Sequence, residues 1–319
     1  MPDNAANELF QAQTLDGGIT CLDADYVRPG LASLYLLRQG DEYAVIETGT
    51  SQSAQCLFAM LRARDIDFAQ VRYVIPTHVH LDHAGGAGVM MEAFEDATLL
   101  IHPRGARHMI SPGKLVASSM AVYGEEVFKQ LYGEVLPIAE SRVRVMEDGD
   151  SVELSGRRLE FRHTRGHANH HFCVWDAATK GWFTGDMFGV CYPWWRFGDD
   201  DFVLPATTPT QFDPEAYLAS LEILAQYSPQ FMYLTHHGRI EYTAVKAQRL
   251  AAQVDRYREI ALENMDTPAE LQDAITRYGL EMLSGFDTGV DVEKHREWLG
   301  FDMPLNTQGL QVWQASQAK

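Results

Sequence analysis

Cysteine is scarce in this 319-residue sequence, which limits how the protein can be cross-linked and what kind of metal site it can build. The four cysteines lack the spacing of a disulfide framework or of a thiolate metal site: Cys21, Cys56, Cys173 and Cys191. They are typical of buried, reduced thiols, so we expect a cytoplasmic protein.

Basic residues are also few. Lys and Arg number 26 against 44 Asp and Glu, which gives a net charge of −18. No run of Lys and Arg offsets this acidity locally, so nucleic acid and anionic membrane surfaces are not expected partners. Long apolar runs are absent, and the acidic beginning lacks the basic and apolar regions of a secretory signal. We therefore expect neither a membrane span nor export.

Short β-type segments alternate with helical ones through most of the chain, an order that indicates α/β layering. Strands are predicted at residues 18–22, 32–37, 42–47, 71–75, 97–101, 143–145, 151–154, 158–162, 171–175, 181–184 and 231–234. Helices are predicted over 51–65, with Ser51 as cap, and from a cap at Asp213 to about residue 227. Residues 103–140 form a mostly helical insertion, which we interpret as packing with one face toward a pocket.

The pattern changes near residue 240, where an amphipathic helix over residues 241–264 begins a helical tail. Within the tail, Thr267 to Glu270 has the sequence of a capping box with proline at the first helical position. We therefore predict a main domain over residues 1–240 and a C-terminal helical region over 241–319, packing on or near the active site.

A histidine-rich turn over residues 77–86 follows the predicted strand at 71–75 and carries four metal-ligand side chains: His78, His80, Asp82 and His83. Imidazoles together with a carboxylate suit zinc, iron or manganese, and no cysteine lies nearby to make a closed structural zinc site. Asp82 and His83 are adjacent, so their side chains diverge and suit a second ion better than the first.

Other strand ends offer similar side chains. Three more β-type runs end in a tight turn with glycine and a ligand-type residue, at residues 164–171, 184–186 and 235–238. Eleven of the twelve histidines lie between His78 and His237, and most of them fall at such strand ends. We expect these turns to complete the metal site.

Taken together, these motifs resemble the metallo-β-lactamase superfamily. Residues 77–86 look like its H-x-H-x-D-H-x-G-G signature, and the other motifs follow in the expected order. The resemblance covers roughly residues 17 to 240. It implies a four-layer αββα sandwich with the metals at one edge, here with a C-terminal helical extension. It also implies two divalent ions, with zinc as the first expectation and iron or manganese as alternatives. By the family pattern, one ion is held by His78, His80 and His167 and the other by Asp82, His83 and His237, with Asp186 bridging the two.

This chain departs from the family pattern in two places. Glu47 stands where the first motif usually has aspartate, typically a partner of a ligand histidine, so the longer side chain can change how that ligand is held. In the third motif Arg165 replaces a proline, and His170 stands where glycine is common. His170 and His236 are therefore alternatives to His167 and His237.

The resemblance implies a dinuclear metal-dependent hydrolase, in which a metal-bridging hydroxide attacks a carbonyl carbon and Asp82 accepts the proton. Among superfamily branches, His83 argues against classical β-lactamases, and the net charge of −18 is a poor match for members that process nucleic acid. Flavodiiron proteins carry glutamate where this chain has His80, so the glyoxalase II-like group of thioesterases and ester hydrolases is favoured. A lactonase of the acyl-homoserine-lactone type is the alternative, although Gly189 stands where such enzymes commonly have tyrosine. A ligand-binding or regulatory protein that retains the metal site is the alternative of another class.

The aromatic stretch after Asp186 is the candidate substrate pocket, with Tyr192, Trp194, Trp195 and Arg196. Large aromatics beside a metal site favour an apolar acyl substrate, although ordinary core packing explains them equally well. We expect a small-molecule acyl substrate as the partner, with a homodimer left open.

Overall fold

The computed structural model describes residues 11–317, except for 199, 208–209, 266 and 287. The chain forms two compact units. The first consists of Met1–His163, His170–Gly185 and Gln230–Arg239, and the second of Thr164–Asn169, Asp186–Pro229 and Ile240–Lys319. The second unit thus contains the expected C-terminal region together with two earlier segments of the chain. A single boundary near residue 240 assigns those two segments to the other unit.

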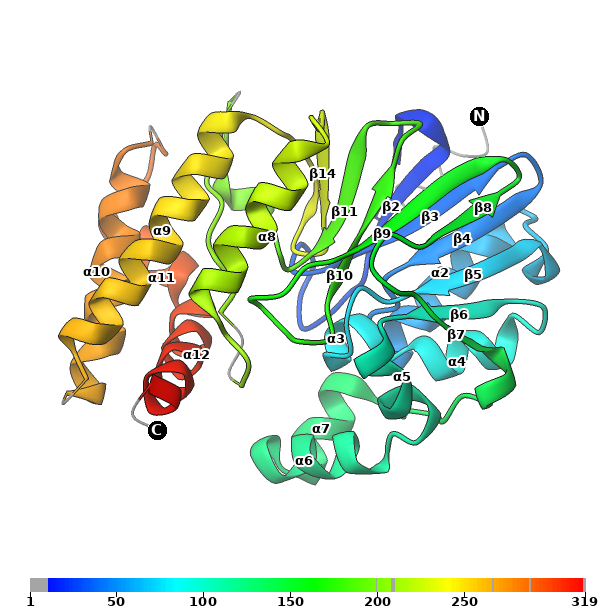
Figure 1. Ribbon diagram of the computed structural model, residues 1–319, viewed down its shortest axis with the longest axis horizontal. Coiled ribbons are helices and arrows are strands. Elements are labelled where there is room, and N and C mark those ends of the chain that lie inside the picture. The colour runs from blue at the N-terminus through cyan, green and yellow to red at the C-terminus, as the bar shows by residue number, and fades with distance from the viewer. Residues whose placement is uncertain (1–10, 199, 208–209, 266, 287, 318–319) are drawn as a thin grey trace. The chain divides into compact units, whose positions relative to one another are not determined.

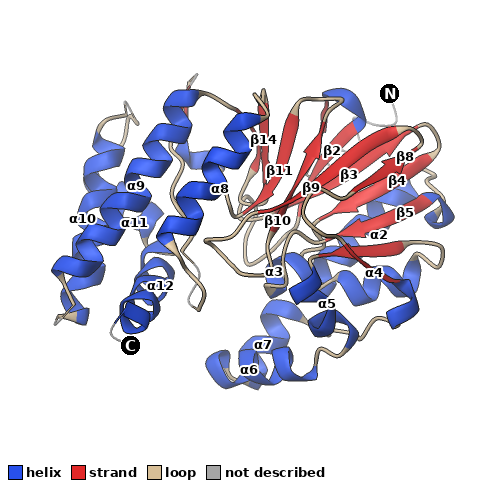
Figure 2. Ribbon diagram, viewed as in Figure 1, coloured by secondary structure: helices blue, strands red, loops and turns tan. Residues whose placement is uncertain are grey.

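The first unit contains two β-sheets (Figure 2). The strands of the seven-stranded sheet lie in chain order: β1 (Ala12–Leu15), β2 (Ile19–Asp23), β3 (Ser33–Gln39), β4 (Glu42–Ile46), β5 (Val71–Ile75), β6 (Thr98–Ile101) and β7 (Val143–Val145). Strands β1 to β4 pair antiparallel, and β4 to β7 pair parallel.

The six-stranded sheet has the order β15-β14-β11-β10-β9-β8. Its strands are β8 (Ser151–Leu154), β9 (Arg157–His163), β10 (Phe172–Asp176), β11 (Gly181–Gly185), β14 (Phe231–Leu234) and β15 (Gly238–Glu241). The parallel pair β11 and β14 brings the end of β14 beside the end of β11, while β8 to β11 pair antiparallel. All the strands predicted from the sequence are present, four with the predicted bounds and the others with ends shifted by one or two residues.

Alternation along the strands of the first sheet divides the core into two layers. In β3, Leu34 and Leu36 face one apolar cluster, whereas Tyr35 and Leu37 face another. The second cluster also takes in residues of the six-stranded sheet, such as Phe161 and Phe172, so the sheets pack face to face. The first cluster lies against helices α2 (Ser51–Ala63) and α4 (Ala87–Ala93), which cover the outer face of the sheet (Figure 1).

The predicted insertion is helical throughout much of its length, with α5 (Pro103–Ile110), α6 (Gly113–Tyr123) and α7 (Glu125–Tyr132). Phe128 and Tyr132 of α7 are buried against Leu81, which lies in the short helix α3 (Leu81–Ala84) of the histidine-rich turn. The insertion therefore packs directly on that turn.

Helix α2 is capped one residue earlier than predicted. The Thr50 side chain accepts a hydrogen bond from the Ser53 backbone, and Ser53 reciprocates in a capping box. The expected cap Ser51 instead donates its hydroxyl hydrogen to the Tyr132 carbonyl, 3.0 Å away. The prediction of Ser51 was wrong because local sequence does not reveal this contact with a segment about eighty residues later.

In the second unit, helices α8 (Pro214–Gln226), α9 (Ala244–Glu263), α10 (Pro268–Ser284), α11 (Val292–Leu299) and α12 (Asp302–Gln317) accompany the short strands β12 (Arg196–Phe197) and β13 (Asp200–Asp201). Asp213 caps α8 as predicted, by accepting from Ala216 N at 3.0 Å. Thr267 makes no capping hydrogen bond through its side chain, so the predicted capping box does not form. Its ψ of 66° lies outside the extended region typical of an N-cap.

Short 3-10 turns connect several of these elements, at Asp16–Gly18, Phe68–Gln70, Glu140–Arg142 and Pro193–Trp195. Among the described residues, none of the helices has both the length and the apolar character that crossing a bilayer requires.

A buried ion pair joins β9 to β10 in the first unit and gives a test of its stability. Arg157 Nε donates to Asp176 Oδ1 at 2.9 Å, and both side chains are almost fully buried. Arg157→Met leaves the carboxylate without its cation, and we expect a loss of about 3–5 kcal/mol in the free energy of unfolding. Chemical denaturation measures this. The neighbouring Arg158→Met is the control, because Arg158 pairs with Glu160 at the surface and should change stability by about 0–1 kcal/mol. Equal losses of unfolding free energy in the two variants would show that the buried ion pair of Arg157 and Asp176 does not contribute this stability.

The pH dependence of stability is expected to include a contribution from His102. Its Nδ1 accepts from Arg104 N at 3.1 Å, and its ring lies 4.1 Å from that of His163. Burial, and next the charge of His163, lowers the pKa of His102 from 6.5 to about 3. The unfolded chain therefore binds a proton at His102 at a higher pH than the folded protein does. The free energy of unfolding decreases as the pH falls from about 6.5 to about 3.

His102→Asn keeps a capping side chain but does not titrate. The difference in unfolding free energy between this variant and the wild type should therefore shift in favour of the variant as the pH is lowered through that range. Denaturation curves over a pH series measure the difference, and a difference that stays constant with pH would contradict the prediction.

Candidate metal centre

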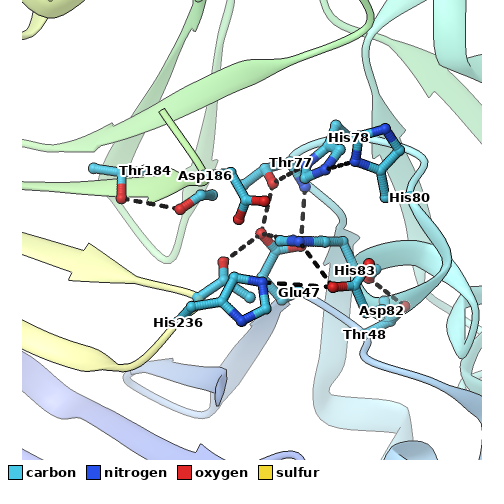
Figure 3. Close-up of polar contacts among 12 residues, drawn as sticks. Glu47, Thr48, Thr77, His78, His80, Asp82, His83, Thr184, Asp186 and His236 are labelled. Carbon is cyan, nitrogen blue, oxygen red and sulfur yellow. Dashed lines mark hydrogen bonds and ion pairs between the residues drawn. The ribbon is translucent and has the colours of Figure 1, made fainter. Parts of the chain in front are cut away.

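The Glu47 carboxylate lies at the meeting point of three strand ends in the first unit (Figure 3). It follows β4 and is only 1% exposed. Its Oε1 accepts from the hydroxyls of Thr77, at 2.6 Å, and Thr235, at 2.9 Å, and lies 3.1 Å from His83 Nδ1. Its Oε2 accepts from Thr77 N at 3.2 Å. A buried charge surrounded by donors in this way fixes the turns that follow β4, β5 and β14.

The backbone of Glu47 has φ +65°, in the left-handed region that non-glycine residues seldom adopt. Such a conformation persists when surrounding contacts determine it, as the three-segment network does here. The family resemblance predicts that Glu47, which stands where the first motif usually has aspartate, is a partner of a ligand histidine. The contact of Glu47 with His83 Nδ1 agrees with that role.

The glycines of the histidine-rich turn allow it to pack on the loop after β4. A Cβ at Gly86 would lie 2.5 Å from the carbonyl oxygens of Thr48 and Thr50. Thr48 Oγ1 donates to the His83 carbonyl at 2.7 Å, and Gly86 N donates to the Gly49 carbonyl at 2.8 Å. Only a residue without a side chain fits at position 86, and the turn is thereby held beside Glu47.

Asp82, His83 and His236 form a group of ligand atoms within 4.8 Å of one another. Asp82 Oδ2 lies 3.7 Å from His83 Nε2 and 3.5 Å from His236 Nε2. In both imidazoles Nδ1 faces an acceptor, the Glu47 carboxylate for His83 and the Leu31 carbonyl, at 2.6 Å, for His236. Anchoring of one ring nitrogen while the other faces a carboxylate is the usual arrangement of metal-binding histidines. The residues fit a divalent metal ion.

His78 and His80 lie beside this group. His78 is completely buried, its Nε2 is 2.6 Å from His80 Nδ1, and its Nδ1 is 3.1 Å from Thr77 Oγ1. The rings of His78 and His83 are 4.0 Å apart. The four predicted ligands of the histidine-rich turn therefore lie close together in the folded chain.

The structure favours His236 over its neighbour His237 as the ligand from this turn. His237 Nε2 lies 3.3 Å from Asp23 Oδ2, a carboxylate oxygen that also accepts from Gly30 N at 2.6 Å. Both histidines lie in the turn after β14, where the path of the backbone, and not the sequence, decides which of the two side chains faces Asp82. We therefore replace His237 by His236 in the predicted ligand set.

His170, the other alternative left open by the sequence, lies near the same turn. Its Nδ1 is 3.4 Å from Val79 N, and its ring is 5.5 Å from that of His80.

In the second unit, the third and fourth motif residues lie together. His167 Nε2 is 3.3 Å from Asp186 Oδ2, and His167 Nδ1 is 3.0 Å from the Ala206 carbonyl. The Asp186 carbonyl accepts from the Tyr217 hydroxyl at 3.2 Å. Gly166 has φ +125°, and a Cβ there would lie 2.3 Å from the Tyr217 backbone, so glycine allows α8 to approach this loop. Here too an imidazole is held through Nδ1 and presents Nε2 to a carboxylate.

The aromatic stretch after Asp186 packs within the second unit. Tyr192 and Trp195 are buried, and the Tyr192 ring lies 4.9 Å from Trp194 and 4.7 Å from Trp195. Tyr192 also donates its hydroxyl hydrogen to Asp302 Oδ1 of α12 at 2.9 Å. The contacts of the three aromatic residues are those of a packed core, whereas Arg196 is exposed. Substrate binding by these residues stays a prediction.

The sandwich of two sheets and its histidine-rich strand ends define an α/β protein with a candidate metal centre. The chain belongs to the metallo-β-lactamase superfamily, whose family model matches residues 27–236. It has the metallo-β-lactamase fold with additional C-terminal helices.

Among curated relatives, it is 26% identical over 216 residues to a metallo-β-lactamase fold-containing protein of Sulfurisphaera tokodaii, covering 66% of this chain and 75% of the relative. It is also 25% identical over 195 residues to the acyl-coenzyme A thioesterase MBLAC2 of Bos taurus, covering 57% of this chain and 68% of that enzyme.

Solved structures show the same fold. A metallo-β-lactamase family protein of Thermus thermophilus matches with a TM-score of 0.63 at 20% identity, covering 94% of each chain. A β-lactamase domain protein of Burkholderia ambifaria matches with a TM-score of 0.62 at 18% identity, covering 96% of this chain and 88% of the other. Both matches extend over nearly the whole of this chain, beyond the residues of the family model.

Glu47 gives a test of how the first unit holds its histidines. Glu47→Ala removes the acceptor shared by Thr77, Thr235 and His83, and each buried donor left without it costs about 1–3 kcal/mol. Because His83 also loses its anchor, we expect metal affinity to fall by about 10- to 100-fold. Competition with a chromophoric chelator measures the affinity, and thermal unfolding measures the stability. Glu42→Ala, at the partly exposed start of β4, should change neither by much. Wild-type metal affinity in Glu47→Ala would show that the carboxylate does not hold a ligand.

Proposed function

We propose that the protein is a dinuclear metal-dependent hydrolase of the metallo-β-lactamase superfamily. In this proposal His78, His80 and His167 would hold one divalent ion, Asp82, His83 and His236 would hold the other, and Asp186 would be a ligand shared by both. Membership of the superfamily and the chemistry of the donor set support it. Histidine and carboxylate ligands accept zinc, iron or manganese, and zinc is our first expectation.

One observation carries this proposal above the others. Both imidazoles of the group Asp82, His83 and His236 are anchored through Nδ1 by acceptors that do not belong to the group. A histidine cluster that served only packing would have no need for every ring to present its other nitrogen toward a shared carboxylate.

Bound at such a site, paired divalent ions supply Lewis acidity, which lowers the pKa of water and polarises a carbonyl group. The chain's own contribution is to orient the ligands and to handle the proton. Asp82 is the member of its group that is partly open to solvent, with 23% of its side chain exposed. A carboxylate at this position can accept a proton and return it to solvent, so we assign Asp82 this role.

We propose a thioester as the bond that is hydrolysed, with other esters next. Relatives named acyl-coenzyme A thioesterases, at 24–26% identity, support this choice. The backbone at Gly189 argues against the lactonase pattern, in which a tyrosine is common at that position. Gly189 has φ +70°, and a Cβ there would lie 2.3 Å from the Leu204 carbonyl oxygen, so this loop excludes a side chain.

Metal analysis combined with a substrate panel tests the proposal. We expect about two metal ions per chain and turnover of acyl thioesters that exceeds turnover of lactones. Preferential lactone hydrolysis would favour the lactonase alternative instead. Two bound ions without turnover of any thioester, ester or lactone would favour a ligand-binding or regulatory protein.

Asp186→Ala tests the bridging role. Because the variant loses the carboxylate beside His167 Nε2, we expect kcat to fall by at least about 100-fold, a loss of the size found when a charge-stabilising group is removed. Asp200→Ala is the matched control, since Asp200 pairs with Arg249 at the surface of the same unit and should leave the rate unchanged. An unchanged rate in Asp186→Ala would refute the dinuclear mechanism.

A further inference from the structure

The C-terminal helix α12 reaches a predicted metal ligand through one buried side chain. Asn306 is 3% exposed, its Nδ2 donates to the Pro205 carbonyl at 3.1 Å, and its Oδ1 accepts from Thr207 N at 2.9 Å. The Thr207 hydroxyl lies 3.0 Å from the Asn306 carbonyl oxygen. Between these two anchored residues lies Ala206, whose carbonyl is the acceptor 3.0 Å from His167 Nδ1.

Asn306 therefore holds the residues on both sides of Ala206, whose carbonyl contacts the His167 imidazole. With Pro205 fixed on one side and Thr207 on the other, the peptide group of Ala206 has little freedom to rotate. A carbonyl held in place keeps a proton on Nδ1 of His167, so that Nε2 is the ring nitrogen directed toward a metal ion. That nitrogen lies 3.3 Å from Asp186 Oδ2.

Helix α12 is itself well anchored inside the second unit. Asp302 at its start accepts from the Tyr192 hydroxyl at 2.9 Å, and Gln314 near its end donates to the Ala261 carbonyl of α9. Met303 packs against Tyr257 of α9, which is fully buried. The helix is therefore a fixed support from which Asn306 can hold the loop.

We propose that Asn306 is a positioning residue for His167, so that the C-terminal helix sets the metal affinity of the ligand set to which His167 belongs. The inference rests on the proposed function for the identity of the ligand. It goes beyond that function by assigning the helical tail a part in building the site. Asn306 acts through the Ala206 carbonyl and does not itself touch the metal or the substrate.

The test compares Asn306→Ala with Thr307→Ala in the full-length protein. Both changes remove a buried polar side chain from the same helix, but the Thr307 hydroxyl donates only to the Met303 carbonyl of α12 itself. We expect Asn306→Ala to weaken the binding of one zinc ion by about 10- to 100-fold, as losses of such supporting contacts usually do. The second ion should bind as in the wild type, and Thr307→Ala should bind both normally.

A second readout does not need metal or turnover. In the metal-free wild type, nitrogen-15 NMR of the imidazoles should show a proton on His167 Nδ1 that exchanges slowly with solvent, because the Ala206 carbonyl accepts it. In Asn306→Ala this proton should exchange faster, while the Nδ1 proton of His236, which the Leu31 carbonyl accepts, should exchange as in the wild type. Wild-type zinc affinities together with wild-type exchange of the His167 Nδ1 proton in Asn306→Ala would overturn the proposal.

If Asn306→Ala does not fold, Asn306→Asp provides a second test, because it removes the Nδ2 donor to the Pro205 carbonyl and keeps an oxygen that accepts from Thr207 N. We expect a smaller loss of affinity for the same ion and a smaller increase in the exchange of the His167 Nδ1 proton, and absence of both effects would overturn the proposal. A wild-type protein that binds no zinc would refute the proposed function, while the exchange of the His167 Nδ1 proton would still decide the role of Asn306.

Discussion

Burial of the Glu47 carboxylate is the constraint on which the first unit's site depends. A negative charge in the interior is tolerated only where donors surround it, and here the donors come from the turns after β5 and β14. Because β5 belongs to the seven-stranded sheet and β14 to the six-stranded sheet, the carboxylate joins the two halves of the sandwich at one edge. His83 is oriented by the same group, so the stability of the fold and the geometry of the candidate metal centre have a common origin.

The candidate ligands of both compact units are held in the same way. The first unit anchors His83 and His236 through Nδ1, and the second anchors His167 through the Ala206 carbonyl. An anchored Nδ1 fixes the orientation of the ring, so a candidate ligand does not have to be ordered when an ion binds. The second unit adds helices α8 and α12 as supports for its loops, so α12 gives the C-terminal helical region a structural role.

Strand positions and the histidine-rich turn could be predicted because they depend on local patterns. Continuous apolar runs mark strands buried on both faces, as in β3, and glycine at position 86 is required by a close backbone approach. Predictions that depended on distant partners failed. Ser51 binds the insertion instead of capping α2, and Thr267 adopts a backbone conformation in which its side chain caps nothing. A single boundary near residue 240 also missed two earlier segments of the second unit.

By itself the sequence determined the kinds of candidate metal ligand and the family, because those are carried by residue identity and spacing along a strand end. Only the tertiary structure decided that His236 and not His237 faces Asp82, since the path of the backbone in the turn after β14 selects between them. It also decided that Glu47 collects donors from two sheets and that Asn306 holds the loop beside His167. These contacts join residues far apart in the chain, and no local pattern records which buried polar groups meet.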